Sequence, residues 1–217
     1  MSKMQLYPDL QITVDSLSEM NIPDERKKVL QVLIDYVVQM VRDIWEVNLN
    51  FICTHNSRRS HLAMIWAQTA ADINNISIKS HSWGTEATAF FHRSVSALKQ
   101  SWFQIETEEW SDTKNPVYLV KASVDKDALK CFSKTFDYNQ SPRENFGAIM
   151  VCDNADTNCP VVLGWTKIPV KYVDPKVADN WESSEEDKVA HYQERSDQIG
   201  SEMLYVFSEV AIALSNK

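Results

Sequence analysis

The sequence predicts a three-layer αβα fold with a four-stranded parallel sheet and a helical extension at the N-terminus. Two observations support this prediction. From residue 47 onward, short apolar runs alternate with helical patterns. Strands that alternate with helices indicate a parallel sheet with helices on both faces. Residues 1–46, in contrast, contain no glycine and have helical character.

Residues 1–46 are expected to form a helical extension of the domain made by residues 47–217. Pro23, followed by Asp24 and Glu25, marks a helix start, because proline and acidic residues favour the first turn. The following apolar residues share one helical face; they are Leu30, Ile34, Val37, Val41 and Ile44. We expect this face to cover the domain, and the alternative is a contact between two copies in a homodimer.

Four apolar runs are predicted to form the strands of the sheet. They are VNLNFIC (47–53), ISIKSHSW (76–83), PVYLVKA (116–122) and FGAIMVC (146–152). Between the last two runs, residues 130–146 alternate at Phe132, Lys134 and Phe136, which predicts an extra hairpin or edge strand. In parallel sheets ligands bind beyond the carboxyl ends of the strands, and Cys53 lies at such an end.

Three helices are expected to follow these strands. RSHLAMIWAQTAADI begins at Arg59, a second helix is expected at about residues 93–103, and a long one at about residues 186–214. The long helix is indicated by apolar residues at helical spacing: Val189, Tyr192, Ile199, Met203, Val206 and Val210.

Charge and composition exclude several classes of function. With 30 acidic and 22 basic residues, the net charge of -8 argues against nucleic acid or an anionic membrane as main partner. No window has the roughly 18 apolar residues of a membrane helix, and no secretory signal is recognised at the N-terminus. We therefore expect a cytoplasmic protein, in which thiols stay reduced. This draws attention to its cysteines: Cys53, Cys131, Cys152 and Cys159.

The loop C-T-H-N-S-R-R-S, residues 53–60, joins the first strand to the first helix. Main-chain N–H groups and a helix N-terminus favour an anion at such a turn. The planar guanidinium of Arg59 could bind two oxygens of that anion. The same field, with a hydrogen bond from Ser60, would stabilise a thiolate at Cys53 and make it a nucleophile. The alternative is that Cys53 is a small apolar core residue and the arginines are solvated.

Two further features lie downstream of this loop. Asp174 precedes Pro175, which restricts it to an extended conformation and predicts a carboxyl presented from a stiff loop. Such a carboxyl could give a proton to a departing oxygen, although an Asp-Pro pair is also a common turn. Cys152 and Cys159 are separated by six residues in VCDNADTNCP. If this segment is helical, their Cα atoms lie about 10.5 Å apart, whereas a disulfide spans at most roughly 6.8 Å, so pairing would require local unwinding.

Metal binding is not indicated by these residues. The cysteine pair has no CxxC partner, the five histidines show no metal-ligand spacing, and DNADTN lacks the glycine and terminal glutamate of a calcium loop. Cys152 and Cys159 could also be two unrelated core thiols. Cys131 has no motif around it and is predicted to be a buried, inert thiol.

The loop at residues 53–60 resembles the C-x5-R-[ST] loop of the low-molecular-weight phosphotyrosine phosphatase superfamily, which includes thioredoxin-coupled arsenate reductases. SHSWGTEA, residues 80–87, is similar to the glycine turn after that family's second strand. His55 stands where the family usually has glycine, and Arg58 where many members have a second loop cysteine. Lys176 and Val177 stand where the phosphatases usually carry tyrosines.

The resemblance implies an arsenate reductase. Cys53 would attack arsenate, Arg59 would hold the oxyanion, and Asp174 would donate the proton. Cys152 would then form a disulfide with Cys53, and Cys159 would resolve it for reduction by thioredoxin. The resemblance implies no bound cofactor, and a substrate-binding set of Thr54, His55, Asn56, Ser57, Arg58 and Ser60.

Two other functions stay open at this point. The first is a protein-tyrosine or small phosphomonoester phosphatase, because phosphate and arsenate have nearly the same shape. In it, the later cysteines would protect the nucleophile from oxidation. The second is a non-enzymatic anion sensor or redox-signalling protein that binds a partner through its helical extension.

Overall fold

A computed structural model describes residues 4–44, 47–138, 145–158 and 165–216 of the chain. The helices are α1 (Pro8–Ser18), α2 (Asp24–Ile44), α3 (Arg59–Ile73), α4 (His92–Gln100), α5 (Asp153–Asn158), the 3₁₀ helix η1 (Pro175–Asn180) and α6 (Glu185–Ser215). The strands are β1 (Val47–Cys53), β2 (Ile78–Gly84), β3 (Gln104–Thr107), β4 (Tyr118–Lys121), β5 (Leu129–Cys131), β6 (Phe146–Met150) and β7 (Trp165–Pro169).

The predicted four-stranded parallel sheet is confirmed, with the strand order β2-β1-β6-β7. Its register places Cys53 beside Gly84 of β2, and Ile52 beside Met150 of β6. The two central strands are almost wholly buried, as expected for parallel strands that are covered on both faces. The carboxyl ends of β1, β2 and β6 therefore meet at one edge of the sheet.

The membership of this sheet differs from the prediction in one strand. The run at residues 116–122 forms β4, which lies in a separate antiparallel sheet of order β3-β4-β5. Only Val120 of β4 is fully buried, because this strand packs on one face alone. The fourth parallel strand is β7, an edge strand whose residues Thr166 and Lys167 are exposed. Its sequence, WTKIP, has little of the apolar character by which buried strands are recognised.

The extra strand expected within residues 130–146 is present in part. β5 is the edge strand of the antiparallel sheet, and Thr135 forms an isolated bridge with Gly84 of β2. Residues 139–144 of this segment lie outside the described residues.

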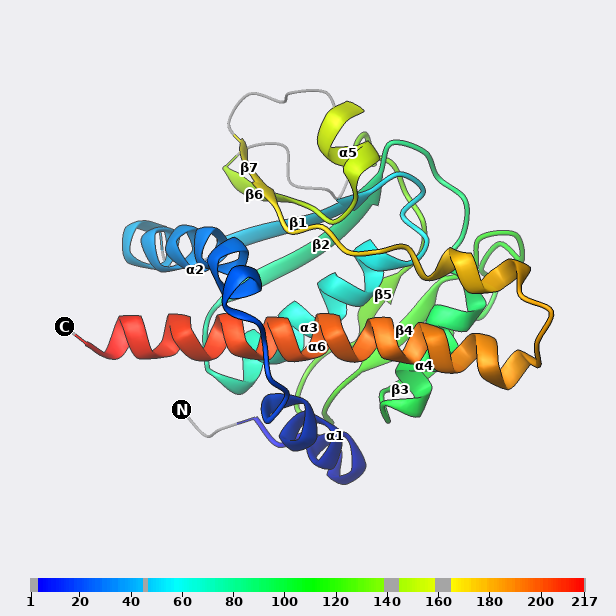
Figure 1. Cartoon of the computed structure of the whole chain (residues 1–217), viewed down its shortest axis with the longest axis horizontal. Helices are drawn as coiled ribbons and strands as arrows, with labels where there is room; N and C mark the ends of the chain where they lie inside the picture. Colours follow the sequence, from blue (N-terminus) through cyan, green and yellow to red (C-terminus); the bar gives the residue numbers. More distant parts are fainter. Residues whose placement is uncertain (1–3, 45–46, 139–144, 159–164, 217) are drawn as a thin grey trace.

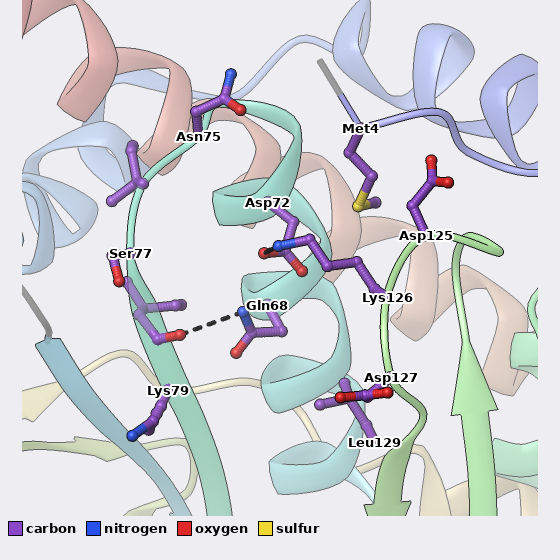
Figure 2. A pocket seen from close by; sticks show the side chains of 12 residues that line it. Met4, Gln68, Asp72, Asn75, Ser77, Lys79, Asp125, Lys126, Asp127 and Leu129 are labelled. Atoms are coloured by element: carbon purple, nitrogen blue, oxygen red, sulfur yellow. Dashed lines mark hydrogen bonds and ion pairs between the residues drawn. The ribbon is translucent and has the colours of Figure 1, made fainter. Parts of the chain in front are cut away.

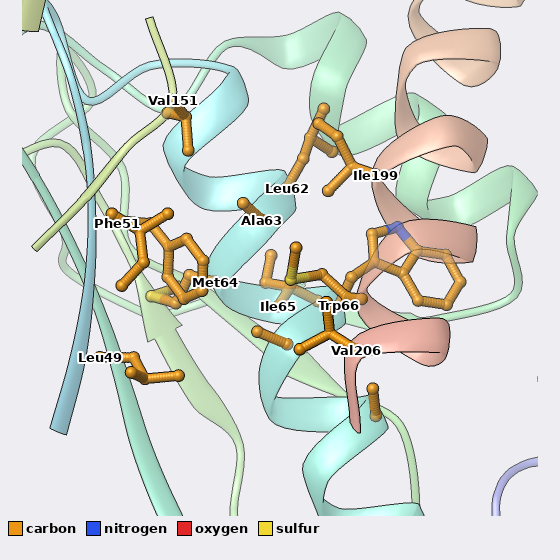
Figure 3. Close-up of a cluster of buried hydrophobic side chains, with 14 of the residues drawn as sticks. Leu49, Phe51, Leu62, Ala63, Met64, Ile65, Trp66, Val151, Ile199 and Val206 are labelled. Carbon is orange, nitrogen blue, oxygen red and sulfur yellow. The ribbon is translucent and has the colours of Figure 1, made fainter. Parts of the chain in front are cut away.

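The sheet lies between α5 on one side and α3 and α6 on the other (Figure 1). α3 is buried on nearly all sides because it lies between β1 and α6. Leu49 and Phe51 lie on its β1 side, and Trp66 and Ile199 lie on its α6 side (Figure 3). The long predicted helix is α6, which packs against α1, α2, α3 and α4. This helix therefore holds the helical layer together.

The N-terminal helices pack on this same core. Leu30, Ile34 and Val37 of α2 are buried in one hydrophobic cluster with β1, α3 and α6, and Val41 is half-buried. α1 contributes Leu10, Val14 and Leu17 to the same cluster. Residues 45 and 46, where the two predicted segments meet, lie outside the described residues. In the described part of the chain, no helix combines the length and apolarity needed to cross a membrane.

Candidate functional site

Residues 53–60 form the turn between β1 and α3, as the sequence predicts. The main chain of this loop rests directly on Gly84 at the end of β2. A Cβ atom at Gly84 would lie 2.6 Å from Asn56 N, Thr54 O and Glu86 O, all of them main-chain atoms. Only glycine fits at this position, which explains the glycine in SHSWGTEA.

Asn56 fixes the shape of the loop. It has a φ of 43°, a left-handed conformation that asparagine tolerates better than most residues. Its Nδ2 donates to Ser60 Oγ at 2.9 Å, and its Oδ1 accepts from the main-chain N of Lys134 at 2.9 Å. The side chain is fully buried. It therefore links the start of α3 to the segment that follows β5.

Cys53 lies at the base of the loop with its side chain almost fully buried. Its Sγ is 3.2 Å from Ser60 Oγ. Because Ser60 Oγ already accepts a hydrogen bond from Asn56, its own hydrogen is free to point at the sulfur. A hydrogen bond of this direction stabilises a thiolate more than a thiol.

The main-chain N–H groups of the loop form the second element of the site. Within the described residues, none of the N–H groups of residues 54–60 donates a hydrogen bond to another protein group. These groups lead into the first turn of α3, where a helix carries unsatisfied donors and a partial positive charge. Such a run of donors favours a small anion.

Arg59 and Asp174 are brought together, although 115 residues separate them. Arg59 Nη2 donates to Asp174 Oδ2 at 2.5 Å, and Nη1 donates to the carbonyl oxygen of Tyr172 at 2.8 Å. Asp174 also caps η1, because its Oδ1 accepts from Lys176 N at 3.0 Å. The guanidinium of Arg59 is thus held at the end of the loop by the segment that carries the predicted proton donor.

Arg58 points into a different part of the molecule. Its Nε donates to Tyr192 Oη at 2.8 Å, and its Nη2 donates to Asp179 Oδ2 at 2.9 Å. The guanidinium also lies over the ring of Phe91, 4.1 Å from the centroid. These contacts connect the start of α3 to α6, η1 and the start of α4.

His55 and Ser57 take part mainly through their main chain. The carbonyl oxygen of His55 accepts from Ser133 Oγ at 2.8 Å, and that of Ser57 accepts from Phe91 N at 2.9 Å. The His55 ring is partly exposed, with Nε2 3.3 Å from Glu86 Oε2. Both residues therefore hold the loop against its neighbours, and the His55 ring lies at its rim.

Cys152 lies next to the loop. Its Sγ is 3.7 Å from Thr54 Oγ1, and the main-chain N–H of Ala155 donates to it over an N–S distance of 3.3 Å. The sulfur is buried and stands immediately before α5, where a helix N-terminus favours negative charge. The structure thus places Cys152 beside Thr54, the residue that follows Cys53 in the chain. Cys159 lies outside the described residues.

Several residues of the site were missed by sequence reasoning. Ser133 and Lys134 bind the loop through a side chain and a main-chain N–H, and only the alternation of their segment hinted at a strand there. Asp179 and Tyr192 hold Arg58. No local pattern marks Asp179, and Tyr192 is predicted only as an apolar residue of the long helix. Cys131 is fully buried as predicted, and burial raises the pKa of its thiol to about 12.

A large cavity lies at the opposite end of the strands. It has a volume of about 920 Å³ and is lined by Gln68 and Asp72 at the end of α3, Lys79 of β2 and the Asp125–Asp127 loop (Figure 2). Lys126 forms an ion pair with Asp72 there at 2.9 Å. No residue of the 53–60 loop lines it, so this cavity is not part of the candidate site.

No protein-family model and no curated protein matches the chain. Among solved structures, a mutant of YwlE from Bacillus subtilis matches at a TM-score of 0.44 and 14% identity, covering 78% of this chain and 99% of that one. A low-molecular-weight phosphotyrosine phosphatase from Vibrio cholerae O395 matches at 0.42 and 17%, covering 78% and 95%. A thioredoxin-dependent arsenate reductase from Corynebacterium glutamicum matches at 0.37 and 15%, covering 90% and 84%.

All of these TM-scores lie below 0.5, so the site is interpreted from its own geometry. The solved structures that match include low-molecular-weight phosphatases and a thioredoxin-dependent arsenate reductase.

Proposed function

We propose that this protein is an enzyme in which Cys53 attacks the central atom of a tetrahedral oxyanion. The observation that carries the proposal is the Ser60 hydroxyl, which Asn56 holds and which lies 3.2 Å from Cys53 Sγ. The main-chain N–H groups of residues 54–60, which have no protein acceptor among the described residues, supply donors for the anion's oxygens. Arg59 supplies the positive charge.

In this proposal Asp174 donates a proton to the oxygen that leaves. Its carboxylate is bound to the Nη2 atom of Arg59, so an oxyanion that binds Arg59 competes for the same donor. The carboxyl that is freed can then turn toward the leaving oxygen. Substrate binding would therefore prepare the acid that the reaction needs.

We propose arsenate as the substrate, because Cys152 lies beside the loop. The Cys53 thiolate forms a bond to arsenic, and the oxygen it displaces leaves as water with the proton from Asp174. Cys152 then attacks Cys53 Sγ; the S–As bond breaks, arsenic keeps the electron pair and leaves as arsenite. Cys159 attacks Cys152 and frees the Cys53 thiolate. A dithiol reductant of the thioredoxin type reduces the Cys152–Cys159 disulfide.

A phosphatase is the second candidate, and the contact between Arg59 and Asp174 favours it. A proton donor is most needed when the leaving oxygen belongs to a poorly acidic alcohol, as in a phosphomonoester. Water would then hydrolyse the Cys53–phosphate bond. Val177, on the segment that carries Asp174, is 49% exposed and offers an apolar contact to the alcohol part of an ester.

The experiment offers arsenate with a thioredoxin system and an aryl phosphate to the same preparations. Cys152→Ser and Cys159→Ser should abolish arsenate turnover but leave phosphate hydrolysis nearly unchanged. The control is Cys131→Ser, which removes a buried thiol of the antiparallel sheet and should spare both reactions at permissive temperature. Arsenate turnover that survives without Cys152 or Cys159 would reject the relay, and loss of neither activity in Cys53→Ser would reject the nucleophile.

Three partner and location expectations follow from the same proposal. The relay requires reduced thiols, which is consistent with a cytoplasmic location. The proposed partners are the oxyanion and the dithiol reductant. A homodimer contact through α1 and α2 stays a prediction, which sedimentation analysis of the full chain would test.

A further inference from the structure

Two consecutive arginines bind two acids of the same short helix. Arg59 binds Asp174, which caps the N-terminus of η1, and Arg58 binds Asp179 near its C-terminus. Both arginines stand where the loop becomes α3. The segment that carries the proposed proton donor is therefore attached to the nucleophile loop at two points.

The two attachment points differ in strength. Asp179 accepts from Arg58 Nη2 at 2.9 Å through one oxygen, and from Arg93 Nη1 at 2.9 Å and Tyr192 Oη at 2.8 Å through the other. These donors come from the residue before α3, from α4 and from α6, and the carboxylate is only 16% exposed. Charge-assisted bonds that form a network in a half-buried site are stronger than isolated surface pairs.

Asp174 is held less firmly. Its carboxylate is 37% exposed, and its one ionic partner among the described residues is Arg59. Its other contact is the capping hydrogen bond from Lys176 N, which lies within η1 itself. The N-terminal end of η1 can therefore exchange its partner, whereas the C-terminal end is anchored by three donors.

Apolar packing supports the same anchor. The guanidinium of Arg58 lies 4.1 Å from the centroid of the Phe91 ring, and that of Arg93 lies 5.5 Å from it. The ring of Tyr192 stacks on Phe91 with a centroid distance of 5.6 Å. Arg93 is itself bound by both oxygens of Glu185 at the start of α6. The anchor thus joins the starts of three helices.

We propose that Arg58 is a positioning residue, which holds η1 through Asp179 while Asp174 leaves Arg59 and turns to the leaving group. This inference rests on the proposed function, in which an oxyanion takes the Arg59 donor that Asp174 occupies. Without the second attachment, the same event would release η1 from the loop. Removal of the Arg58 side chain would therefore lower the efficiency of proton transfer and leave the binding of the anion unaffected.

The kinetic test compares the wild type with Arg58→Met, which keeps an apolar chain over Phe91 but removes the donors. The substrates are aryl phosphates whose leaving groups range from acidic phenols to weakly acidic ones. For the weakly acidic leaving groups kcat should fall at least about 10-fold, because they need the proton. For the most acidic ones it should change by less than about 2-fold, with KM unchanged.

Two further variants make this comparison decisive. Asp179→Asn removes the charge at the other side of the same contact and should show the same dependence on the leaving group. Arg42→Met is the control, because Arg42 is an exposed arginine of α2 that binds only the Ala213 carbonyl oxygen among its described contacts. An equal loss on all leaving groups, or a rise in KM alone, would overturn the positioning role.

A second measurement separates this inference from the proposed function. Amide hydrogen exchange of residues 176–180 is measured in the wild type and in Arg58→Met, with and without sulfate as the anion probe. Sulfate should accelerate exchange in η1 at least about 3-fold more in the variant than in the wild type. If the wild type turns over no substrate, the proposed function is rejected but the anchor is not. Equal exchange in both proteins would reject the anchor whatever the enzyme does.

Discussion

At the scale of single residues, the proposed chemistry depends on the direction of one hydroxyl group. Ser60 Oγ accepts from Asn56 Nδ2 and lies 3.2 Å from Cys53 Sγ. An alanine at Asn56 would free the hydroxyl to rotate, and an alanine at Ser60 would remove it. Because a hydrogen bond to a charged atom contributes about 1.5–3 kcal/mol, this one contact has a measurable effect on a thiolate.

The first prediction concerns Ser60→Ala. Alkylation of Cys53 by iodoacetamide at mildly acidic pH should slow, and turnover should fall by about 10- to 100-fold, because the thiolate loses its donor. Rates of alkylation followed by mass spectrometry measure this directly. The matched control is Ser196→Ala, which removes a buried hydroxyl bound to Trp66 in the core and should leave the sulfur unaffected. Equal reactivity of Cys53 with and without Ser60 would contradict the assignment.

At the scale of elements, the loop at residues 53–60 is shaped by the end of a neighbouring strand. β2 ends at Gly84, whose missing side chain lets the main chain of Thr54 and Asn56 lie against it. After β5, Lys134 continues this support, because its carbonyl accepts from Gly84 N and its own N–H binds Asn56. The loop at residues 53–60 is thus packed between two strand ends.

The second prediction is that Gly84→Ala removes activity beyond its effect on stability. A Cβ there meets only main-chain atoms at 2.6 Å, so the loop itself must shift. We expect a cost of about 1–3 kcal/mol in unfolding free energy and loss of sulfate binding by calorimetry. Gly147→Ala is the control, because its Cβ would meet the Tyr36 side chain at 2.7 Å and leave the loop alone. Retained sulfate affinity in Gly84→Ala would count against this role.

The third prediction concerns α5, the helix that starts after Cys152. Lys171 Nζ binds Asp153 Oδ1 at 3.0 Å and Asp156 Oδ2 at 2.7 Å, which restrains the helix. Lys171→Met should therefore speed amide exchange within α5 by about two-fold. Oxidation should speed it much more, because a helical spacing of about 10.5 Å between cysteines seven positions apart is too long for a disulfide.

Hydrogen exchange with mass spectrometry tests both parts of this prediction. Lys28→Met removes a comparable surface ion pair, with Glu25 on α2, and should leave α5 unchanged. Identical exchange of α5 in reduced and oxidised protein would exclude the remodelling that the relay requires.

At the scale of the whole molecule, the fully buried His61 and the partly buried His81 make the fold sensitive to acid. His61 is fully buried, with Nε2 3.1 Å from the Phe132 carbonyl oxygen and no partner for Nδ1 among the described residues. Burial, followed by the charge of Lys134, lowers the pKa of His61 well below its usual value. Burial, with Lys134 and Lys79, lowers the pKa of His81 to about 4.

The fourth prediction follows from these shifts. Below about pH 6.5 the unfolded chain binds protons that the folded histidines do not, so stability is lost as the pH falls toward 4. Each histidine contributes a slope of up to about 1.4 kcal/mol per pH unit. Urea unfolding at neutral pH and at about pH 5 measures the loss, which His81→Gln should reduce. The exposed His92 provides the control, and an unchanged slope in His81→Gln would contradict the prediction.

Much of the site's framework can be read from the chain alone. The strand at residues 47–53, the helix that begins at Arg59 and the long C-terminal helix match the structure closely. Each is marked by a local signal: an apolar run, a helical periodicity, or both. The position of Cys53 at a strand end follows from these bounds, because a chain that passes from strand to helix turns at the residues between them.

Other features were decided only by tertiary structure. The parallel sheet is completed by β7 and not by the more apolar residues 116–122. This choice depends on which face each strand buries, and the periodicity of the sequence does not reveal that face. The acidic partners of Arg58 and Arg59 are more than 100 residues away in sequence. Local patterns specify elements because they reflect interactions within a few residues, whereas these ion pairs exist only once α6 and η1 have packed beside the start of α3.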